Sequence, residues 1–160
     1  MRTLITGGIK SGKSSRALVL AEQFDTPRYF LATAIPFDDE MRERIRLHQQ
    51  ERKERFITIE EPLALHTKLT NNMILDCIPM WLNNILYYEK VQELDNLIEL
   101  FLQNLPQNIV IVTNEIGWGV IPDNPLARQY EILLGKVNMR LASYCDAVEL
   151  MVSGIPLKIK

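Results

Sequence analysis

Several features that mark specialised classes of protein are scarce or missing in this sequence. Its 160 residues include two cysteines, Cys77 and Cys145, and two histidines, too few and too scattered for a disulfide framework or a zinc cluster. No apolar run approaches the roughly 20 residues of a membrane-spanning helix. The net charge of −2 gives no sign of a nucleic-acid-binding surface. Gly7 and Gly8 interrupt the early apolar segment, which disfavours a secretory leader. We therefore expect a cytoplasmic protein with reduced thiols that inserts in no membrane and binds no nucleic acid.

Short β-rich runs alternate with longer helical patterns along the whole chain. Strands are predicted at Arg2–Thr6, Arg28–Thr33, Ile57–Ile59, Asn72–Asp76, Ile109–Thr113, Ala147–Val152 and Leu157–Ile159. Helices are predicted at Lys13–Phe24, Asp38–Arg55, Pro62–Leu69, Met80–Tyr88, Gln92–Leu105 and Leu126–Tyr144. Continuous apolar runs such as IVIV at 109–112 are typical of parallel strands that are buried on both faces. The alternation predicts one three-layer α/β domain spanning residues 1–160, with a mostly parallel central sheet and helices on both faces.

A phosphate-binding loop is predicted directly after the first strand. Residues Gly7 to Ser14, GGIKSGKS, match GxxxxGK[ST] at every fixed position, between a predicted strand and a predicted helix. Glycines let successive N–H groups face one anion, and the new helix adds its positive end. Lys13 would reach the β- and γ-phosphates, and the Ser14 hydroxyl would bind Mg²⁺. A flexible loop that merely caps the helix is the alternative, but the complete pattern favours a P-loop NTPase-like fold.

Asp76 is the second candidate for this site. It ends the apolar run at 73–75, and the carboxyl ends of parallel strands are where ligands bind in open α/β sheets. The carboxylate could hold Mg²⁺ opposite Ser14. It could equally cap the helix that follows Cys77, because aspartate is a good N-cap residue.

A histidine lies within a highly charged predicted helix. The segment 38–55 carries twelve charged residues in eighteen, yet Met41, Ile45, His48 and Arg52 share one face by their spacing. Because Met41 and Ile45 favour burial, His48 is expected to point toward the protein, beside arginines. Those cations disfavour a protonated imidazole, which suits a neutral nucleophile that attacks a phosphate. A structural histidine on a solvated helix is the alternative.

Taken together, these stretches resemble the bifunctional adenosylcobinamide kinase/adenosylcobinamide-phosphate guanylyltransferase family of cobalamin biosynthesis. The resemblance covers nearly the whole chain in order: ITGGIKSGKSS, LATA followed by DDEMRERIRLH, EEP at 60–62, LDC at 75–77, VTNEIGWGVIPDNPLAR, LG and VN in the following helix, and VSGIPLKIK. It implies a kinase step that uses ATP or GTP on adenosylcobinamide. It also implies a transfer of GMP from GTP, through a covalent GMP–histidine, to adenosylcobinamide phosphate. The family's histidine falls on His48, and the family tends toward homo-oligomers.

The resemblance also implies a set of nucleotide contacts. They fall on Gly7, Gly8, Ile9, Lys10, Ser11, Gly12, Lys13, Ser14, Ala32, Thr33, Ala34, Gln49, Gln50, Glu51, Arg52, Glu60 and Asp76. A carboxylate at Glu60 or Asp76 could pair with the N–H edge of guanine, and the sequence does not say which. Four positions, Pro79, Tyr130, Glu131 and Met139, depart from the family's pattern. We expect these in corrinoid handling or subunit contacts, where Trp81, Tyr87, Tyr88 and Trp118 could also serve unless they are core.

Two other functions compete with this one. A kinase for another small metabolite would share the phosphate loop and leave His48 structural. A nucleotide switch that binds a protein partner would normally show an NKxD guanine motif, and the nearest candidate, Thr113-Asn114-Glu115-Ile116, lacks its lysine and aspartate. A further difficulty concerns geometry, since the γ-phosphate meets an acceptor in one reaction and the α-phosphorus meets His48 in the other. We expect the charged helix, which has few apolar anchors, to move between the two.

Overall fold

A single sheet organises the described part of the chain. The computed structural model describes residues 1–36, 38–52 and 55–160, and the side chains of Arg44, His48 and Glu51 lie outside this description. Within it, seven strands pair in the order β3-β2-β4-β5-β1-β6-β7. They are β1 (Arg2–Gly7), β2 (Tyr29–Ala32), β3 (Ile57–Glu60), β4 (Met73–Asp76), β5 (Ile109–Val112), β6 (Ala147–Val152) and β7 (Ile155–Lys158). All neighbouring strands run parallel except β6 and β7.

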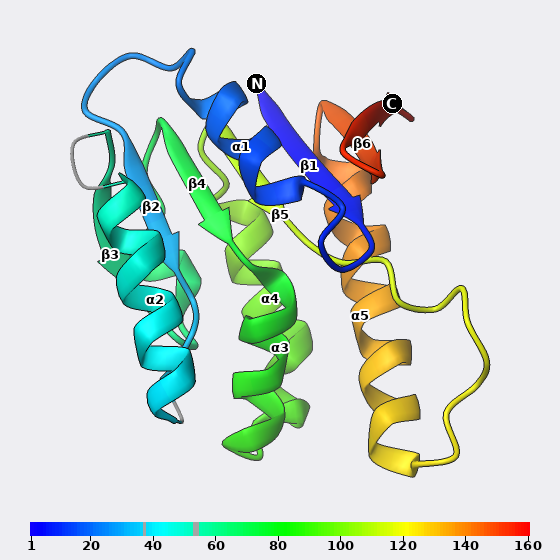
Figure 1. The fold of residues 1–160 in the computed structure, drawn as a ribbon. Helices are drawn as coiled ribbons and strands as arrows, with labels where there is room; N and C mark the ends of the chain where they lie inside the picture. The colour runs from blue at the N-terminus through cyan, green and yellow to red at the C-terminus, as the bar shows by residue number, and fades with distance from the viewer. Residues whose placement is uncertain (37, 53–54) are drawn as a thin grey trace.

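Helices cover both faces of this sheet (Figure 1). They are α1 (Lys13–Ala21), α2 (Asp39–Arg52), α3 (Ile78–Tyr87), α4 (Leu94–Gln103) and α5 (Pro125–Tyr144). Buried residues of α3, α4 and α5 share one core cluster, and those of α1 belong to a second cluster. The predicted fold is thereby confirmed, with three layers, a mostly parallel sheet and helices on both sides. No helix among the described residues is long and apolar enough to cross a bilayer.

Alternation along the strands explains why the sheet needs both layers. Leu4 faces the α3–α5 cluster while Ile5 faces the α1 cluster, and in β4 Leu75 and Ile74 divide in the same way. Successive side chains of a strand point to opposite faces, so a strand that is apolar throughout must be covered twice. The IVIV run of β5 is fully buried for this reason.

The predicted helix at Pro62–Leu69 is wrong. In its place lies a short 3₁₀ turn at Leu65–Thr67. The Glu61 carboxylate accepts hydrogen bonds from the N–H groups of Leu63 and Ala64, at 3.0 and 2.9 Å between heavy atoms. Local bonds from a side chain to the backbone compete with helix formation, and here they close a turn before a helix can propagate.

Other elements differ from expectation mainly at their ends. Helix α1 ends at Ala21 because the next N–H groups, those of Gln23 and Phe24, bond to carbonyls three residues back. Helix α2 ends at Arg52, and Arg55 lies in a turn, while the predicted residues 53–54 fall outside the described part. Neither Cys77 nor Cys145 forms a disulfide, and burial raises the pKa of the Cys145 thiol to about 11.

One ion pair joins the helix of the phosphate loop to the sheet. The Arg16 Nε and Nη2 atoms each donate to a different oxygen of Glu149, both at 2.8 Å. Both side chains are largely removed from water, at 28% and 15% exposure. The two-pronged bond to Arg16 lowers the pKa of the Glu149 carboxyl below its usual range.

Replacing Glu149 should therefore destabilise the protein in a pH-dependent way. At neutral pH we expect Glu149→Gln to cost about 1–3 kcal/mol of unfolding free energy. Since the folded-state pKa is lowered, the contribution of Glu149 is complete above its unfolded pKa, near 4.5, and disappears as the pH falls through the folded value. Urea unfolding of both proteins across this range measures the difference.

A matched control is Glu43→Gln, which removes a similar two-pronged bond to Arg46 on the exposed surface of α2. This change should have little effect at any pH, because solvent screens an exposed pair. If the loss of unfolding free energy in Glu149→Gln stayed the same in acid, it would not arise from the ion pair between Glu149 and Arg16.

Candidate functional site

The parallel register brings the predicted site residues of four strands to one edge of the sheet. Ala32 at the end of β2 is paired with Glu60 of β3 on one side and with Asp76 of β4 on the other. Asp76 is in turn paired with Val112 of β5, and β1 ends beside β5 in the phosphate loop. Carboxyl ends of parallel strands form the ligand-binding edge in this type of fold, so residues far apart in sequence meet here.

The phosphate loop takes the backbone conformations that its glycines allow. Gly7 and Gly12 have φ of 147° and 96°, and Lys10 has a φ of 58°. A Cβ atom on Gly7 would lie 2.6 Å from the main-chain oxygen of Met151, closer than real atoms approach. The Gly154 N–H, in the turn between β6 and β7, donates to the Ser11 carbonyl at 3.0 Å and braces the loop from outside. The loop is therefore preformed, with Gly8, Ile9 and Lys10 exposed at its tip.

Lys13 is buried within this loop. Its side chain is 8% exposed, and its Nζ donates to the Gly8 carbonyl oxygen at 2.5 Å. Burial lowers the pKa of the Lys13 ammonium, while the neighbouring Cys77 and Asp76 side chains act in the opposite direction. The lysine and the aspartate, 63 positions apart, are thus electrostatic neighbours. The adjacent Ser14 lies in the first turn of α1 and is exposed.

Ser11 adds a further polar group inside the loop. Its Oγ is buried and has no hydrogen-bond partner among the described residues. Buried hydroxyl groups without a partner are costly, and such groups in native structures usually mark a place that a ligand or a water completes.

A network around Thr33 fixes the loop after β2. The Thr33 hydroxyl accepts from the Cys77 N–H at 3.1 Å and donates to the Cys77 carbonyl at 2.9 Å. Asn84 Nδ2 donates to the carbonyls of Thr33 and Pro62, at 2.7 and 2.9 Å. Thr33 is completely buried, so it positions this loop, whereas Ala32 and Ala34 on either side are half-buried.

Asn84 is the positioning residue that sequence reasoning missed. It is completely buried in α3, a helix whose other buried residues are apolar or proline. A single amide on the apolar face of the predicted helix at Met80–Tyr88 was the available signal. Such an amide indicates a buried hydrogen-bond network, although the sequence could not name its partners.

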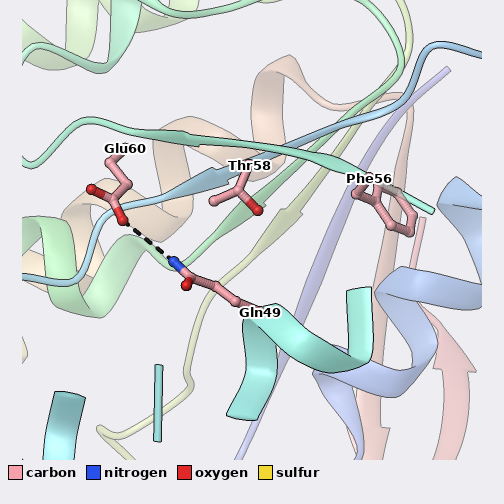
Figure 2. Close-up of a pocket in the computed structure, with 4 residues that line it drawn as sticks. All are labelled: Gln49, Phe56, Thr58 and Glu60. Carbon is pink, nitrogen blue, oxygen red and sulfur yellow. Dashed lines mark hydrogen bonds between the residues drawn. The ribbon is translucent and has the colours of Figure 1, made fainter. Parts of the chain in front are cut away.

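Contacts of polar side chains hold the described part of helix α2 against β2 and β3. The Gln49 Nε2 donates to Glu60 Oε1 at 3.4 Å, and the Arg52 guanidinium stacks on the Phe30 ring, 3.4 Å from its centre. Figure 2 shows Gln49 reaching from α2 toward Glu60, with Thr58 and Phe56 further along the same face of β3. These four side chains, those of Gln49, Phe56, Thr58 and Glu60, line a pocket of about 500 Å³.

Besides Gln49, two other predicted nucleotide contacts of α2, Gln50 and Arg52, have side chains that the structure describes. Gln50 is exposed, while Arg52 is only 6% exposed beneath the helix. His48 immediately precedes Gln49 in α2, and its imidazole, like the Glu51 side chain, lies outside the described residues. The nucleophile thus stays a prediction, although its helix borders the same edge of the sheet as Glu60.

Comparison with known proteins identifies the family of this chain. A family model described as cobinamide kinase / cobinamide phosphate guanyltransferase matches residues 3–159. The chain belongs to this family. It is 37% identical to the bifunctional adenosylcobalamin biosynthesis protein CobP of Pseudomonas aeruginosa, over all of this chain and 98% of the relative. It is 36% and 34% identical to the proteins of that description named CobU from Salmonella typhimurium and Escherichia coli, over the full length of both chains in each pair.

Two of the departures from the family's pattern contact each other directly. The Tyr130 hydroxyl donates to the Pro79 carbonyl at 3.1 Å, and burial raises the pKa of Tyr130 to about 12. Glu131, the next residue, lines a pocket together with Tyr130, whereas Met139 is exposed further along α5. Among the aromatic residues considered for a surface role, Trp81 is core, while Tyr87, Tyr88 and Trp118 are exposed.

The crowding at Gly7 gives a direct test of the loop geometry. We expect Gly7→Ala to lower the unfolding free energy by at least about 2 kcal/mol, because its Cβ would collide with the main-chain oxygen of Met151 and its φ of 147° is unfavourable for alanine. Urea denaturation of the purified variant measures the loss.

Gly8→Ala is the matched control for this experiment. A Cβ atom there meets nothing within 4 Å, so its effect should stay within about 1 kcal/mol in either direction. Equal stability of the two variants would show that the tight turn at Gly7 is not present in solution.

Proposed function

We propose that one nucleotide site at the carboxyl edge of the sheet serves both reactions of the family. In the first, the terminal hydroxyl of adenosylcobinamide attacks the γ-phosphorus of ATP or GTP, which releases a nucleoside diphosphate. In the second, a ring nitrogen of His48 attacks the α-phosphorus of GTP and pyrophosphate leaves. A phosphate oxygen of adenosylcobinamide phosphate then attacks the same phosphorus, which yields adenosylcobinamide-GDP and frees the histidine.

The observation that carries this proposal is the preformed phosphate loop with Lys13 buried in it beside Asp76. The Lys13 ammonium bonds to a carbonyl of its own loop and has no need of a large movement to meet a β- or γ-phosphate. Its low exposure strengthens the attraction, since a charge that water screens poorly acts more strongly on a bound anion. The buried Ser11 hydroxyl offers one further donor inside the loop.

The donors at this edge fit a magnesium ion that accompanies the nucleotide. The Ser14 hydroxyl is exposed at the start of α1, and the Asp76 carboxylate lies close enough to Lys13 to affect its pKa. Magnesium typically takes one or two protein oxygens and completes its shell with phosphates and water. Ser14 and Asp76 would hold the ion, which would neutralise charge on the phosphates. Among the described residues no cluster of three metal-binding side chains is present, which agrees with a site that depends on the substrate.

The two candidate carboxylates have different surroundings, and this favours Glu60 as the partner of guanine. Asp76 neighbours Lys13 and so belongs to the phosphate end of the site. Glu60 lines the pocket that also contains the Phe56 ring and already accepts a bond from an amide N–H of Gln49. The N1–H and N2–H₂ groups of guanine present donors of the same kind. Adenine presents no such pair, so this carboxylate would favour GTP in the transfer reaction.

Incubation with GTP labelled at the α-phosphate tests the covalent step. We expect the wild type to retain acid-labile, alkali-stable label, because a phosphorus–nitrogen bond joins GMP to the imidazole. His48→Ala should retain none. Lys13→Ala should weaken both this labelling and the phosphorylation of adenosylcobinamide, since both reactions use the phosphate loop.

The labelling result distinguishes the bifunctional transferase from a plain kinase. Phosphorylation of adenosylcobinamide without label on either the wild type or His48→Ala would leave a plain kinase with a structural histidine. Label that persisted on His48→Ala would assign the nucleophile to another residue.

Exchange of Glu60 tests the origin of guanine preference. We expect Glu60→Gln to reduce the yield of covalent GMP at limiting GTP about tenfold or more, because one neutral amide replaces two charge-assisted bonds. With inosine triphosphate, which lacks the N2 amino group, the same substitution should reduce the yield of covalent adduct by less. Glu43→Gln is the matched control, because it removes the same negative charge from the exposed surface of α2, outside the predicted nucleotide contacts. If Glu60→Gln reduced the yield of covalent adduct equally with GTP and with inosine triphosphate, Glu60 would not recognise the guanine base.

A further inference from the structure

A second cavity lies on the other face of the sheet, beside the loop that follows β5. It measures about 690 Å³ and is enclosed by α3, the beginning of α5 and residues of the 116–124 segment. Its walls are mainly apolar, and amide and carboxylate groups interrupt them. The residues that matter here are Leu86, Ile116, Leu126 and Tyr130, with Asn83 and Glu131 as the polar members.

This cavity, which we call the α3–α5 pocket, is joined to the phosphate loop through one residue. The Glu115 N–H donates to the Gly7 carbonyl at 3.1 Å, and the Glu115 carboxylate accepts from Thr6 at 3.4 Å. The next residue, Ile116, lines the pocket and packs against the core. The wall of the pocket at Ile116 is therefore connected to the phosphate loop through a single neighbouring residue of the backbone.

The walls of the pocket are held in place by hydrogen bonds. Asn138 accepts from Thr113 at 2.7 Å and donates to the Asn114 carbonyl at 2.9 Å, which fixes the start of the loop. Asn124 caps α5, and Arg128 donates to the Pro122 carbonyl at 2.7 Å, which fixes the end. Between these anchors the loop exposes Trp118, Val120 and Ile121, at 74%, 93% and 74%. The loop between the two anchors thus carries further exposed apolar side chains.

We propose that the α3–α5 pocket receives one edge of the corrin ring of adenosylcobinamide, an inference that rests on the proposed function. A corrin is a broad apolar macrocycle with methyl groups and carboxamide arms on its periphery. The apolar walls match the ring edge, while Asn83, Asn124 and Glu131 can hydrogen-bond to the amide arms. A nucleotide would need no such extended apolar surface, and its own site lies along the edge at β1 to β4.

The position of the pocket also favours this occupant over a second copy of the chain. The acceptor hydroxyl is at the end of a flexible arm, and it must reach the γ-phosphate while the ring stays bound. A subsite that is connected to the phosphate loop through Ile116 and Glu115 meets this requirement, because it fixes the ring and leaves the arm to span the remaining distance. The polar groups among the apolar walls would be of less use in a plain apolar contact between copies.

The decisive variant is Leu126→Glu, which adds a charge to the apolar wall. Leu126 is 60% exposed, so the substitution should leave folding intact. We expect KM for adenosylcobinamide in the kinase reaction to rise about tenfold or more, with KM for the nucleotide and covalent labelling by GTP unchanged. Gln129→Glu is the matched control. It adds the same charge to an exposed position one turn along α5, outside the pocket, and should behave as wild type.

Fluorescence provides a reading of binding that needs no turnover. The chain has two tryptophans, and Trp118 is exposed beside the pocket while Trp81 is 1% exposed in the core. Added adenosylcobinamide, which absorbs strongly, should quench the wild type with saturation at lower concentrations than Leu126→Glu. Trp118→Phe corrects for absorption of light by the corrinoid itself.

Each result bears on one of the two proposals. Equal KM for the corrinoid and equal quenching in the wild type and Leu126→Glu would overturn the proposed subsite. A change in the sedimentation of Leu126→Glu with an unaltered KM would also overturn it, and would assign this surface to contacts between copies of the chain. Saturable quenching that Leu126→Glu abolishes, in a wild type that forms no phosphorylated product or GMP adduct, would support the subsite and overturn the proposed function instead.

Discussion

The parallel register of one doubly covered sheet is the constraint on which the site depends. Because β1 to β5 run in the same direction, their carboxyl ends deliver the phosphate loop, Ala32, Glu60 and Asp76 to a single edge. Apolar packing on both faces fixes this register, since a slip by one residue would turn the alternating side chains of every strand to the wrong core. The chemistry is thus positioned by residues that never touch a ligand.

Positioning within that edge depends on buried polar groups, and each is tied to the backbone of a neighbouring segment. Asn84 joins the loops after β2 and β3, and Asn138 joins the end of β5 to the following loop. Amide side chains suit this task because one group can both donate and accept. Lys13 follows the same principle, because its bond to Gly8 holds the ammonium over the loop before a phosphate arrives. The site is organised in advance, which reduces the cost of ordering it around a substrate.

Prediction from the sequence succeeded where a local pattern decides the outcome. Apolar runs and helical periodicity located the seven strands and five α-helices of the described residues, and the loop with the GxxxxGKS spacing lies between β1 and α1 as that motif requires. It failed at Pro62–Leu69, where the carboxylate of Glu61 closed a turn that residue-by-residue preferences do not describe. The partners of Asn84 and Arg52 could not be foreseen either, since both arise from contacts between distant segments. Spacing predicted which helix carries His48, but no pattern fixes the distance from that helix to a phosphate.

The two reactions place conflicting demands on α2, and its packing bears on how they are met. Under the proposed function, a rigid helix could not both leave the γ-phosphate open to an acceptor and bring the His48 imidazole to the α-phosphorus of the same nucleotide. Helix α2 is the most polar of the helices, and Met41 and Ile45 on its predicted inner face are only half-buried. The Gln49–Glu60 bond is long at 3.4 Å, and guanine would compete for exactly that carboxylate under the proposed assignment. Base recognition would then loosen the contact that holds α2 against β3. In this way the nucleotide that supplies GMP would itself release the helix that carries the histidine, whereas ATP, which lacks those donors, would leave the helix in place for phosphorylation.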